Sequence, residues 1–145
     1  MKLTPPERGS VIRYAYLWAD EHNRGQEDAR KDRPSLVVAL SVHREDGNTE
    51  VLALAITHTR PSDTSQAVIL PADVKKHLGL DTEPSWIVTT EANAFIWPGP
   101  DIRPIPGRKP SAFVYGRIPD GLLRKVAQSF LANRSRQRAA MIVRN

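Results

Sequence analysis

PSLVVALSVHREDGNTEVLALAIT, residues 34–57, is the stretch that decides the fold. Two apolar runs, 36–40 and 51–56, flank a polar segment with Asp-Gly-Asn at positions 46–48. Such a triplet between two apolar runs is typical of a β-hairpin turn. The run over 34–42 is apolar almost throughout, which indicates a strand buried on both of its faces. Residues 34–57 therefore predict two antiparallel strands that are buried in the core.

Shorter elements are expected on either side of this hairpin. The strand signals are β-branched and aromatic residues, and the helix signals are apolar residues at helical spacing. In chain order we expect a strand over 10–18, a long polar loop over 19–32, a strand over 66–70, a short helix over 71–78 closed by Gly79, strands over 85–90 and 94–97 that bend near Asn93, and a stiff proline-rich loop over 98–110.

The last expected element is an amphipathic helix over about 120–134, with Asp120 as its N-cap and a basic tail after it. Its apolar face is formed by residues at helical spacing: Leu122, Leu123, Val126, Ala127, Phe130 and Leu131. Arg124 and Lys125 lie on its polar side. The fold class predicted for residues 1–145 is mainly β with helices (α+β). We expect a single domain, a small SH3-like β-barrel with a short helix and a C-terminal amphipathic helix.

Charge separates the two parts of the chain. It holds 21 Lys and Arg against 16 Asp and Glu, a formal charge of +5. Residues 103–145 contain ten basic residues and a single acid, Asp120. A basic section of this kind suits a polyanion such as nucleic acid, an acidic membrane surface or an acidic protein tail. A solvated helix face followed by a basic tail is the alternative interpretation.

Several classes of protein and site are excluded or disfavoured. The absence of cysteine excludes disulfides, thiolate metal sites and a cysteine nucleophile. Residues 1–8 lack the apolar region of a signal peptide, and the longest apolar runs are too short to cross a bilayer. The four histidines lack metal-ligand spacing, and no nucleotide-cofactor fingerprint occurs. We expect a cytoplasmic protein without membrane contact, metal or cofactor.

The candidate site lies where the two hairpin strands begin and end. Residues 31–34 (Lys-Asp-Arg-Pro) precede the first strand, and residues 57–61 (Thr-His-Thr-Arg-Pro) follow the second. Pairing of the strands brings the two segments to one end of the sheet. A guanidinium with threonine hydroxyls beside it suits a phosphodiester, because Arg binds phosphate through two parallel hydrogen bonds. The alternative is that Arg33 forms a structural ion pair with Asp32 or Glu91, and spacing alone leaves both open.

Three segments in order resemble the PemK/MazF family of toxin endoribonucleases. They are Arg-Gly-x-Val-Ile at 8–12, Arg-Pro followed by Leu-Val-Val within 33–38 after a glycine-containing polar loop, and Leu-Ala-Ile-Thr at 54–57. The resemblance covers the first half of the chain, and the second half is similar in outline. It implies an SH3-like barrel that forms a homodimer and cuts single-stranded RNA without metal. It also implies a cognate antitoxin whose extended acidic tail fills the RNA groove.

The resemblance also implies roles for individual residues. Arg33 matches the catalytic arginine before proline, and Thr57 matches the catalytic hydroxyl residue at the end of the third strand. Arg33 is expected to stabilise charge on the phosphate while the ribose 2′-OH attacks it, since a guanidinium stays protonated. Thr57 orients the phosphate. Glu91 is the third candidate catalytic residue, and it and His58 are the two candidates for the general base.

Substrate-binding roles are expected for residues that flank the site: Lys31, His58, Thr59 and Arg60. Trp18 and Trp97 are interpreted as structural, with base stacking as the alternative. Some family members carry an Arg-x-Asp pair where this chain has Thr89-Thr90-Glu91, so the basic partner is missing. That departure keeps a second hypothesis open, a non-catalytic nucleic-acid-binding or regulatory module with the same barrel. A third hypothesis is a protein-binding partner that grips an acidic tail.

Overall fold

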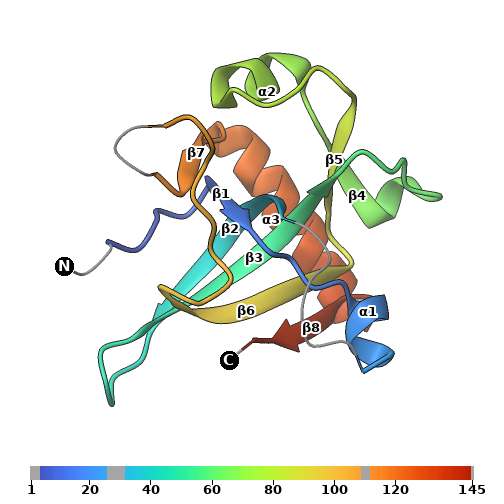
Figure 1. Ribbon diagram of the computed structural model, residues 1–145. Helices are drawn as coiled ribbons and strands as arrows, with labels where there is room; N and C mark the ends of the chain where they lie inside the picture. The colour runs from blue at the N-terminus through green and yellow to red at the C-terminus, as the bar shows by residue number, and fades with distance from the viewer. Residues whose placement is uncertain (1–3, 26–31, 109–111, 145) are drawn as a thin grey trace.

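The hairpin forms as predicted and becomes the centre of a curled sheet. The computed structural model describes residues 4–25, 32–108 and 112–144. Its elements in chain order are β1 (Ser10–Tyr14), α1 (Ala19–Asn23), β2 (Arg33–Val42), β3 (Thr49–Thr57), the 3-10 turn η1 (Thr64–Gln66), β4 (Ala67–Leu70), α2 (Ala72–Leu78), β5 (Ser85–Val88), β6 (Glu91–Trp97), β7 (Val114–Arg117), α3 (Asp120–Ser135) and β8 (Ala140–Val143). The protein is a mixed α+β structure in which the strands are mostly antiparallel and form a half-barrel (Figure 1).

The order of the strands explains where the sheet opens. Neighbouring strands run β4-β5-β3-β2-β1-β7, with β6 paired to β3 and β8 paired in parallel to β6. One edge of β3 carries β2 along most of its length. The other edge is shared, because residues 49–53 pair with β6 whereas Ile56 and Thr57 pair with β5. The sheet therefore splits at the C-terminal end of β3.

Two hydrophobic clusters lie on opposite faces of the hairpin strands. Leu36 and Val38 belong to one cluster, which α2 and α3 complete, while Val37 belongs to the other. Successive residues of a strand point to opposite faces, so a continuous apolar run is needed when both faces are buried. The prediction of burial on both faces is confirmed for residues 35–38, but it is wrong at the end of the run, where Leu40 is 36% and Val42 67% exposed.

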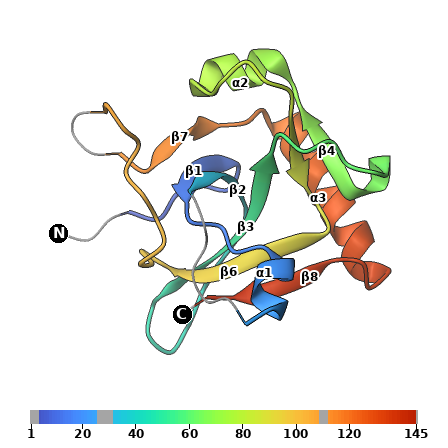
Figure 2. The ribbon, with the colours of Figure 1, turned by 45° about the vertical axis from the view of Figure 1, so that its right-hand side comes forward.

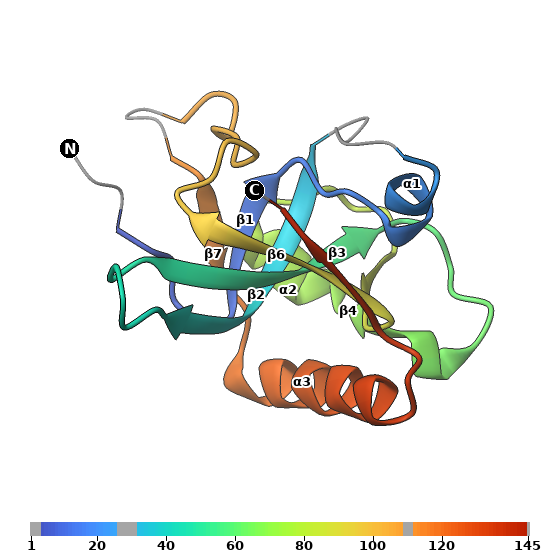
Figure 3. The same ribbon diagram turned by 90° about the horizontal axis from the view of Figure 1, so that it is seen from below.

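The helices cover different parts of the sheet. Figure 3 shows α3 lying across one face. In Figures 1 and 2, α2 and α1 lie at opposite ends of the molecule, and α1 is beside β8. The predicted helix over 71–78 is confirmed as α2, which ends at Gly79 with φ of 72°. Within the described ranges, every helix is too short or too polar to cross a membrane.

The segment after β1 departs from the prediction. The strand expected over 10–18 ends at Tyr14, and residues 19–32, expected to be a loop, begin with α1. This helix has five residues, too few to show a helical hydrophobic period. Its first turn is closed locally, because the backbone N–H of Trp18 donates to Glu21 Oε1 at 3.2 Å and that of His22 donates to the Trp18 carbonyl at 2.9 Å.

The C-terminal part was predicted least well. The break in the strand region comes at residues 89–90 instead of Asn93, which lies inside β6. Two short strands, β7 and β8, were not expected. The basic segment after the helix contains a strand that was not predicted: β8 pairs with β6, and the side chain of Arg144 is 6% exposed beside Asp101, with 3.0 Å between Nη2 and Oδ1.

Helix α3 differs from its prediction in two details. Asp120 is its first helical residue, and Pro119 takes the N-cap position. Leu123, Val126 and Phe130 are buried as expected, but Leu131 is 64% exposed. The Arg124 and Lys125 side chains are exposed as predicted.

A buried polar network ties β6 to the segment after β1. The side chain of Asn93 is fully buried. Its Oδ1 accepts from the backbone N–H of Leu17 at 2.9 Å, and its Nδ2 donates to the Leu17 carbonyl at 2.8 Å. The same oxygen accepts from Arg144 Nη1 at 3.2 Å and from the Tyr14 hydroxyl at 3.3 Å. The Asn93 side chain thus provides hydrogen-bond partners for both backbone polar groups of Leu17, which lies beyond the end of β1.

We predict that Asn93→Ala lowers the free energy of unfolding by roughly 3 kcal/mol, because it leaves two buried backbone groups of Leu17 without partners. Urea denaturation measures this loss. Asn48→Ala in the exposed hairpin turn is the matched control and is expected to change stability by less than about 0.5 kcal/mol. Equal stabilities for the two variants would contradict the role given to Asn93.

Candidate functional site

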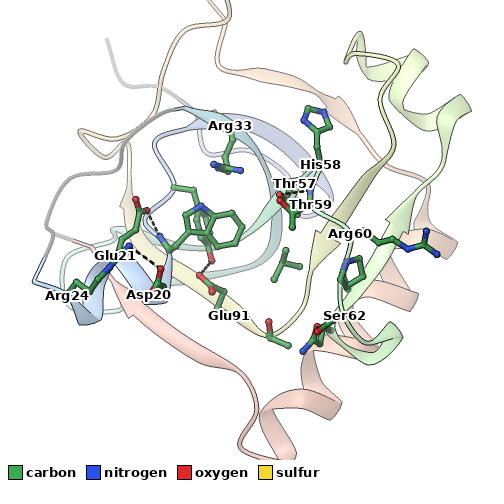
Figure 4. Close-up of a pocket in the computed structure, with 17 residues that line it drawn as sticks. Asp20, Glu21, Arg24, Arg33, Thr57, His58, Thr59, Arg60, Ser62 and Glu91 are labelled. Carbon is green, nitrogen blue, oxygen red and sulfur yellow. Dashed lines mark hydrogen bonds and ion pairs between the residues drawn. The ribbon is translucent and has the colours of Figure 1, made fainter.

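A groove of about 960 Å³ opens where the sheet splits. The C-terminal end of β3, the corner between β5 and β6, the loop into η1 and the start of α1 form its walls. The lining residues that carry polar or aromatic groups are Tyr16, Trp18, Asp20, Glu21, Arg24, Arg33, Thr57, His58, Thr59, Arg60, Ser62, Gln66, Thr90 and Glu91. Six of the seven sequence-predicted site residues are therefore brought together (Figure 4). The seventh, Lys31, lies outside the described residues.

The hairpin register places Arg33 across from Thr57. Ser35 pairs with Ala55. Two residues further toward the open end of the hairpin, the same antiparallel register sets Arg33 opposite Thr57. In Figure 4 Arg33 and Thr57 lie near each other at the edge of the groove. The expectation that the two strand ends converge is met because an antiparallel hairpin fixes which residues face each other.

Arg33 rests on an aromatic ring. Its Cζ lies 4.8 Å from the centroid of the Trp18 ring, a cation–π distance. Its Nε is buried without a hydrogen-bond partner among the described residues. Burial lowers the pKa of Arg33 below its usual value, while the negative charge of Glu21 opposes this shift. The guanidinium remains a cation, because arginine does not lose its proton in proteins.

The two carboxylates proposed as structural partners of Arg33 have other contacts. Asp32 lies 3.5 Å from the guanidinium nitrogens of Arg13 and Arg103. Glu91 Oε1 accepts from the backbone N–H of Ala19 at 2.9 Å. Among the described residues neither carboxylate forms an ion pair with Arg33, so the structural ion-pair interpretation is wrong for Asp32 and Glu91.

Glu91 is a partly buried carboxyl at the base of the groove. Its Oε1 also accepts from the Tyr16 hydroxyl at 3.2 Å. Burial raises the pKa of Glu91, and the hydrogen bonds from Ala19 and Tyr16 offset part of that rise. Both bonds end on Oε1, and Oε2 has no hydrogen-bond partner among the described residues. A raised pKa makes the ionised carboxylate a stronger base than an exposed one.

Tyr16 and Trp18 connect the cation and the carboxylate of the site. Their rings meet edge to face, with centroids 5.1 Å apart. Burial raises the pKa of Tyr16 well above its usual value, and the charge of Glu91 raises it further, so the phenol stays protonated and donates. The sequence analysis did not predict the contact between Trp18 and Arg33, and it did not identify Tyr16 as a site residue. Trp97, also interpreted as structural, is 6% exposed in the core.

The remaining predicted residues differ in how they face the groove. Thr57 Oγ1 accepts from the backbone N–H of Thr59 at 3.1 Å, which leaves its O–H free to donate. The His58 imidazole lies between two carboxylates, with Nε2 2.9 Å from Asp81 and Nδ1 3.5 Å from Glu83. Figure 4 shows His58 and Arg60 on the rim, pointing away from the centre. The geometry therefore favours Glu91 over His58 as a base.

Thr89 stands where the resemblance noted in the sequence would allow a basic residue. Thr89 is fully buried, and its Oγ1 is 2.8 Å from Ser129 Oγ and 3.1 Å from Asn133 Nδ2. It serves as a packing and hydrogen-bonding residue between the sheet and α3. A long basic side chain at this position would have to displace those contacts. In the ranges described, no group of three or more His, Asp or Glu side chains is arranged to hold a metal ion.

Comparison with known proteins gives no family for the chain. No protein-family model matches it, and no curated protein matches it either.

We predict that Glu91→Gln becomes more stable relative to wild type as pH rises from 4 to 7. The unfolded chain ionises Glu91 first, because its carboxyl has the lower, ordinary pKa there. Wild type therefore loses stability until the folded carboxyl also ionises. Thermal melts at several pH values measure the difference, and Glu45→Gln in the exposed hairpin turn controls for loss of one carboxylate. A Glu91→Gln advantage that shrinks with rising pH would contradict the assignment.

Proposed function

We propose that the protein is a metal-independent endoribonuclease that cuts single-stranded RNA in this groove. The observation that carries the proposal is Arg33, a cation held on Trp18, opposite Thr57, and free of the neighbouring carboxylates Asp32 and Glu91. A purely structural arginine is normally satisfied by such partners. Arg33 Nε has no hydrogen-bond partner among the described residues, and Arg33 lines the groove, where its guanidinium can donate to a phosphate.

The proposed reaction is transesterification. The ribose 2′-oxygen attacks the adjacent phosphorus, the bond to the 5′-oxygen breaks, and the products carry a 2′,3′-cyclic phosphate and a 5′-hydroxyl. Glu91 Oε2 accepts the proton of the 2′-OH. Arg33 stabilises the charge that develops on the phosphate oxygens, and Thr57 donates a hydrogen bond to one of them. The 5′-oxygen takes its proton from solvent or from the protonated Glu91.

The architecture supports a wider assignment to the PemK/MazF type. A curled, mostly antiparallel half-barrel with a C-terminal helix on one face is compatible with an SH3-like barrel. We extend the proposal to the homodimer and to the antitoxin with an acidic tail that this type implies. The Arg33 guanidinium at the groove suits a carboxylate of such a tail as well as it suits an RNA phosphate.

Thr89 supports a second candidate function. Because this buried residue replaces the basic member of the pair that some relatives of that type carry, the site has one cation fewer for transition-state charge. A module that binds RNA or DNA in the groove without cutting it, as a regulatory protein, is the function that this observation favours.

The test is cleavage of long unstructured RNAs of diverse sequence with EDTA present. Wild type is expected to produce 2′,3′-cyclic phosphate ends. Arg33→Ala is expected to slow cleavage by about 10²–10³-fold, a typical cost of removing one donor that stabilises developing charge. Arg33→Lys keeps the charge but loses the planar fork, so its rate is expected to lie between the two.

Arg44→Ala, an exposed arginine in the hairpin turn, is the matched control and is expected to cut like wild type. Equal rates for Arg33→Ala and wild type would contradict the proposed mechanism. RNA that stays intact but binds in a manner that depends on Arg33 would favour the non-catalytic module.

A further inference from the structure

Three exposed arginines follow one another at the C-terminal end of α3. Arg134, Arg136 and Arg138 are all exposed. Among the described residues none of the three forms an ion pair, whereas Arg24, at the groove, is paired with Asp20 at 3.1 Å. We call residues 134, 136 and 138 the arginine cluster. Three cations within five consecutive residues concentrate positive charge at this helix end.

The backbone holds this cluster in a defined turn. The N–H of Arg138 donates to the Asn133 carbonyl at 2.7 Å, and that of Gln137 donates to the Arg134 carbonyl at 3.0 Å. These two bonds form a Schellman motif, in which the residue after the C-cap is left-handed. Gln137 takes that conformation with φ of 57°, although glycine is the usual residue there. The cluster is thus part of a closed helix end, where the backbone positions of its arginines are fixed.

The same helix end is attached to the groove wall. Asn133 Nδ2 donates to the carbonyls of Ser65 and Thr89, both at 3.0 Å. Ser65 lies in η1, and Ser62 and Gln66 on either side of it line the groove. Figure 3 shows the C-terminal end of α3 on the side of the molecule where the chain enters β4. One loop therefore separates the groove from the arginine cluster.

Asp63 lies on this loop, close enough to Arg138 of the cluster for the two charges to interact. Hydrogen bonds from Ser65 lower the pKa of Asp63 most, and the charge of Arg138 lowers it further. The Asp63 carboxylate itself accepts from the backbone N–H of Ser65 at 2.9 Å, so it is used within the loop.

We propose that the arginine cluster binds the phosphates of the RNA strand that leaves the groove across η1. The bound strand would then be longer than the groove alone can hold, with sequence-independent contacts outside it. This proposal rests on the proposed function, because it requires RNA in the groove. Phosphate contacts of this kind add affinity that depends strongly on salt.

The test compares binding of a short and a long strand. Mixed-sequence 2′-O-methyl oligonucleotides of about four and roughly sixteen nucleotides are titrated by fluorescence anisotropy, because 2′-O-methylation blocks cleavage. The variant is the triple change Arg134→Gln, Arg136→Gln and Arg138→Gln. The matched control, which loses the same charge elsewhere, is Arg44→Gln, Arg124→Gln and Lys125→Gln. Circular dichroism melts confirm that both variants fold.

We expect the cluster variant to bind the long strand about tenfold or more weakly at about 50 mM salt, with the slope of log K against log salt reduced by about 2. The short strand and the control variant are expected to behave like wild type. Equal losses in the two triple variants, or equal losses for both strands, would overturn the proposal.

Two further outcomes separate this proposal from the proposed function. If wild type and the cluster variant bind both oligonucleotides equally well, the arginine cluster does not contact RNA, and the assignment of the groove as the RNA site stands. If wild type binds neither strand, the proposed function fails and this proposal fails with it. Binding of wild type to anionic phospholipid vesicles that the cluster variant loses, with RNA binding unchanged, would assign the cluster to a membrane surface and overturn the proposal.

Discussion

The hydrogen bonds of Asn93 with Leu17 are the constraint on which the site depends. They fix the backbone of the chain just after it leaves β1. Leu17 lies outside the described strands, so the Asn93 amide supplies the hydrogen bonds of its N–H and C=O groups. Arg144, the residue after β8, donates to the same amide oxygen, so the C-terminal end of the described chain is coupled to this segment. The residues on either side of Leu17 are the two aromatic side chains of the groove, which the network therefore holds in place.

Those two aromatic side chains keep opposite charges apart inside one groove. Trp18 carries Arg33 on its face, and Tyr16 donates to Glu91. A direct Arg33–Glu91 ion pair would neutralise both groups and leave neither for a ligand. The cation instead remains available for an anion, and the carboxylate keeps a raised pKa because it is partly buried. The proposed transesterification requires such a separation, with Arg33 as the phosphate-binding group and Glu91 as the base.

Sequence reasoning succeeded where local rules determine the geometry. The hairpin turn and the apolar run over 34–42 predict β2 and β3, and their antiparallel register brings Arg33 and Thr57 together. It failed where the decisive contacts are distant in sequence. The β8 strand has four residues and pairs with β6, and the role of Asn93 depends on bonds to a residue 76 positions away. The short helix α1 carries no periodic signal, so Trp18 could not be placed against Arg33.

The most direct test of the account is the response of the Arg33 side-chain N–H resonances to a short 2′-O-methyl RNA, followed by ¹⁵N-resolved NMR. Binding of phosphate by the guanidinium predicts a shift of these resonances and slower exchange with solvent, with a smaller response in Thr57→Val. RNA that binds while the Arg33 resonances stay unmoved would place the ligand elsewhere and contradict the assignment of this groove as the nucleic-acid site.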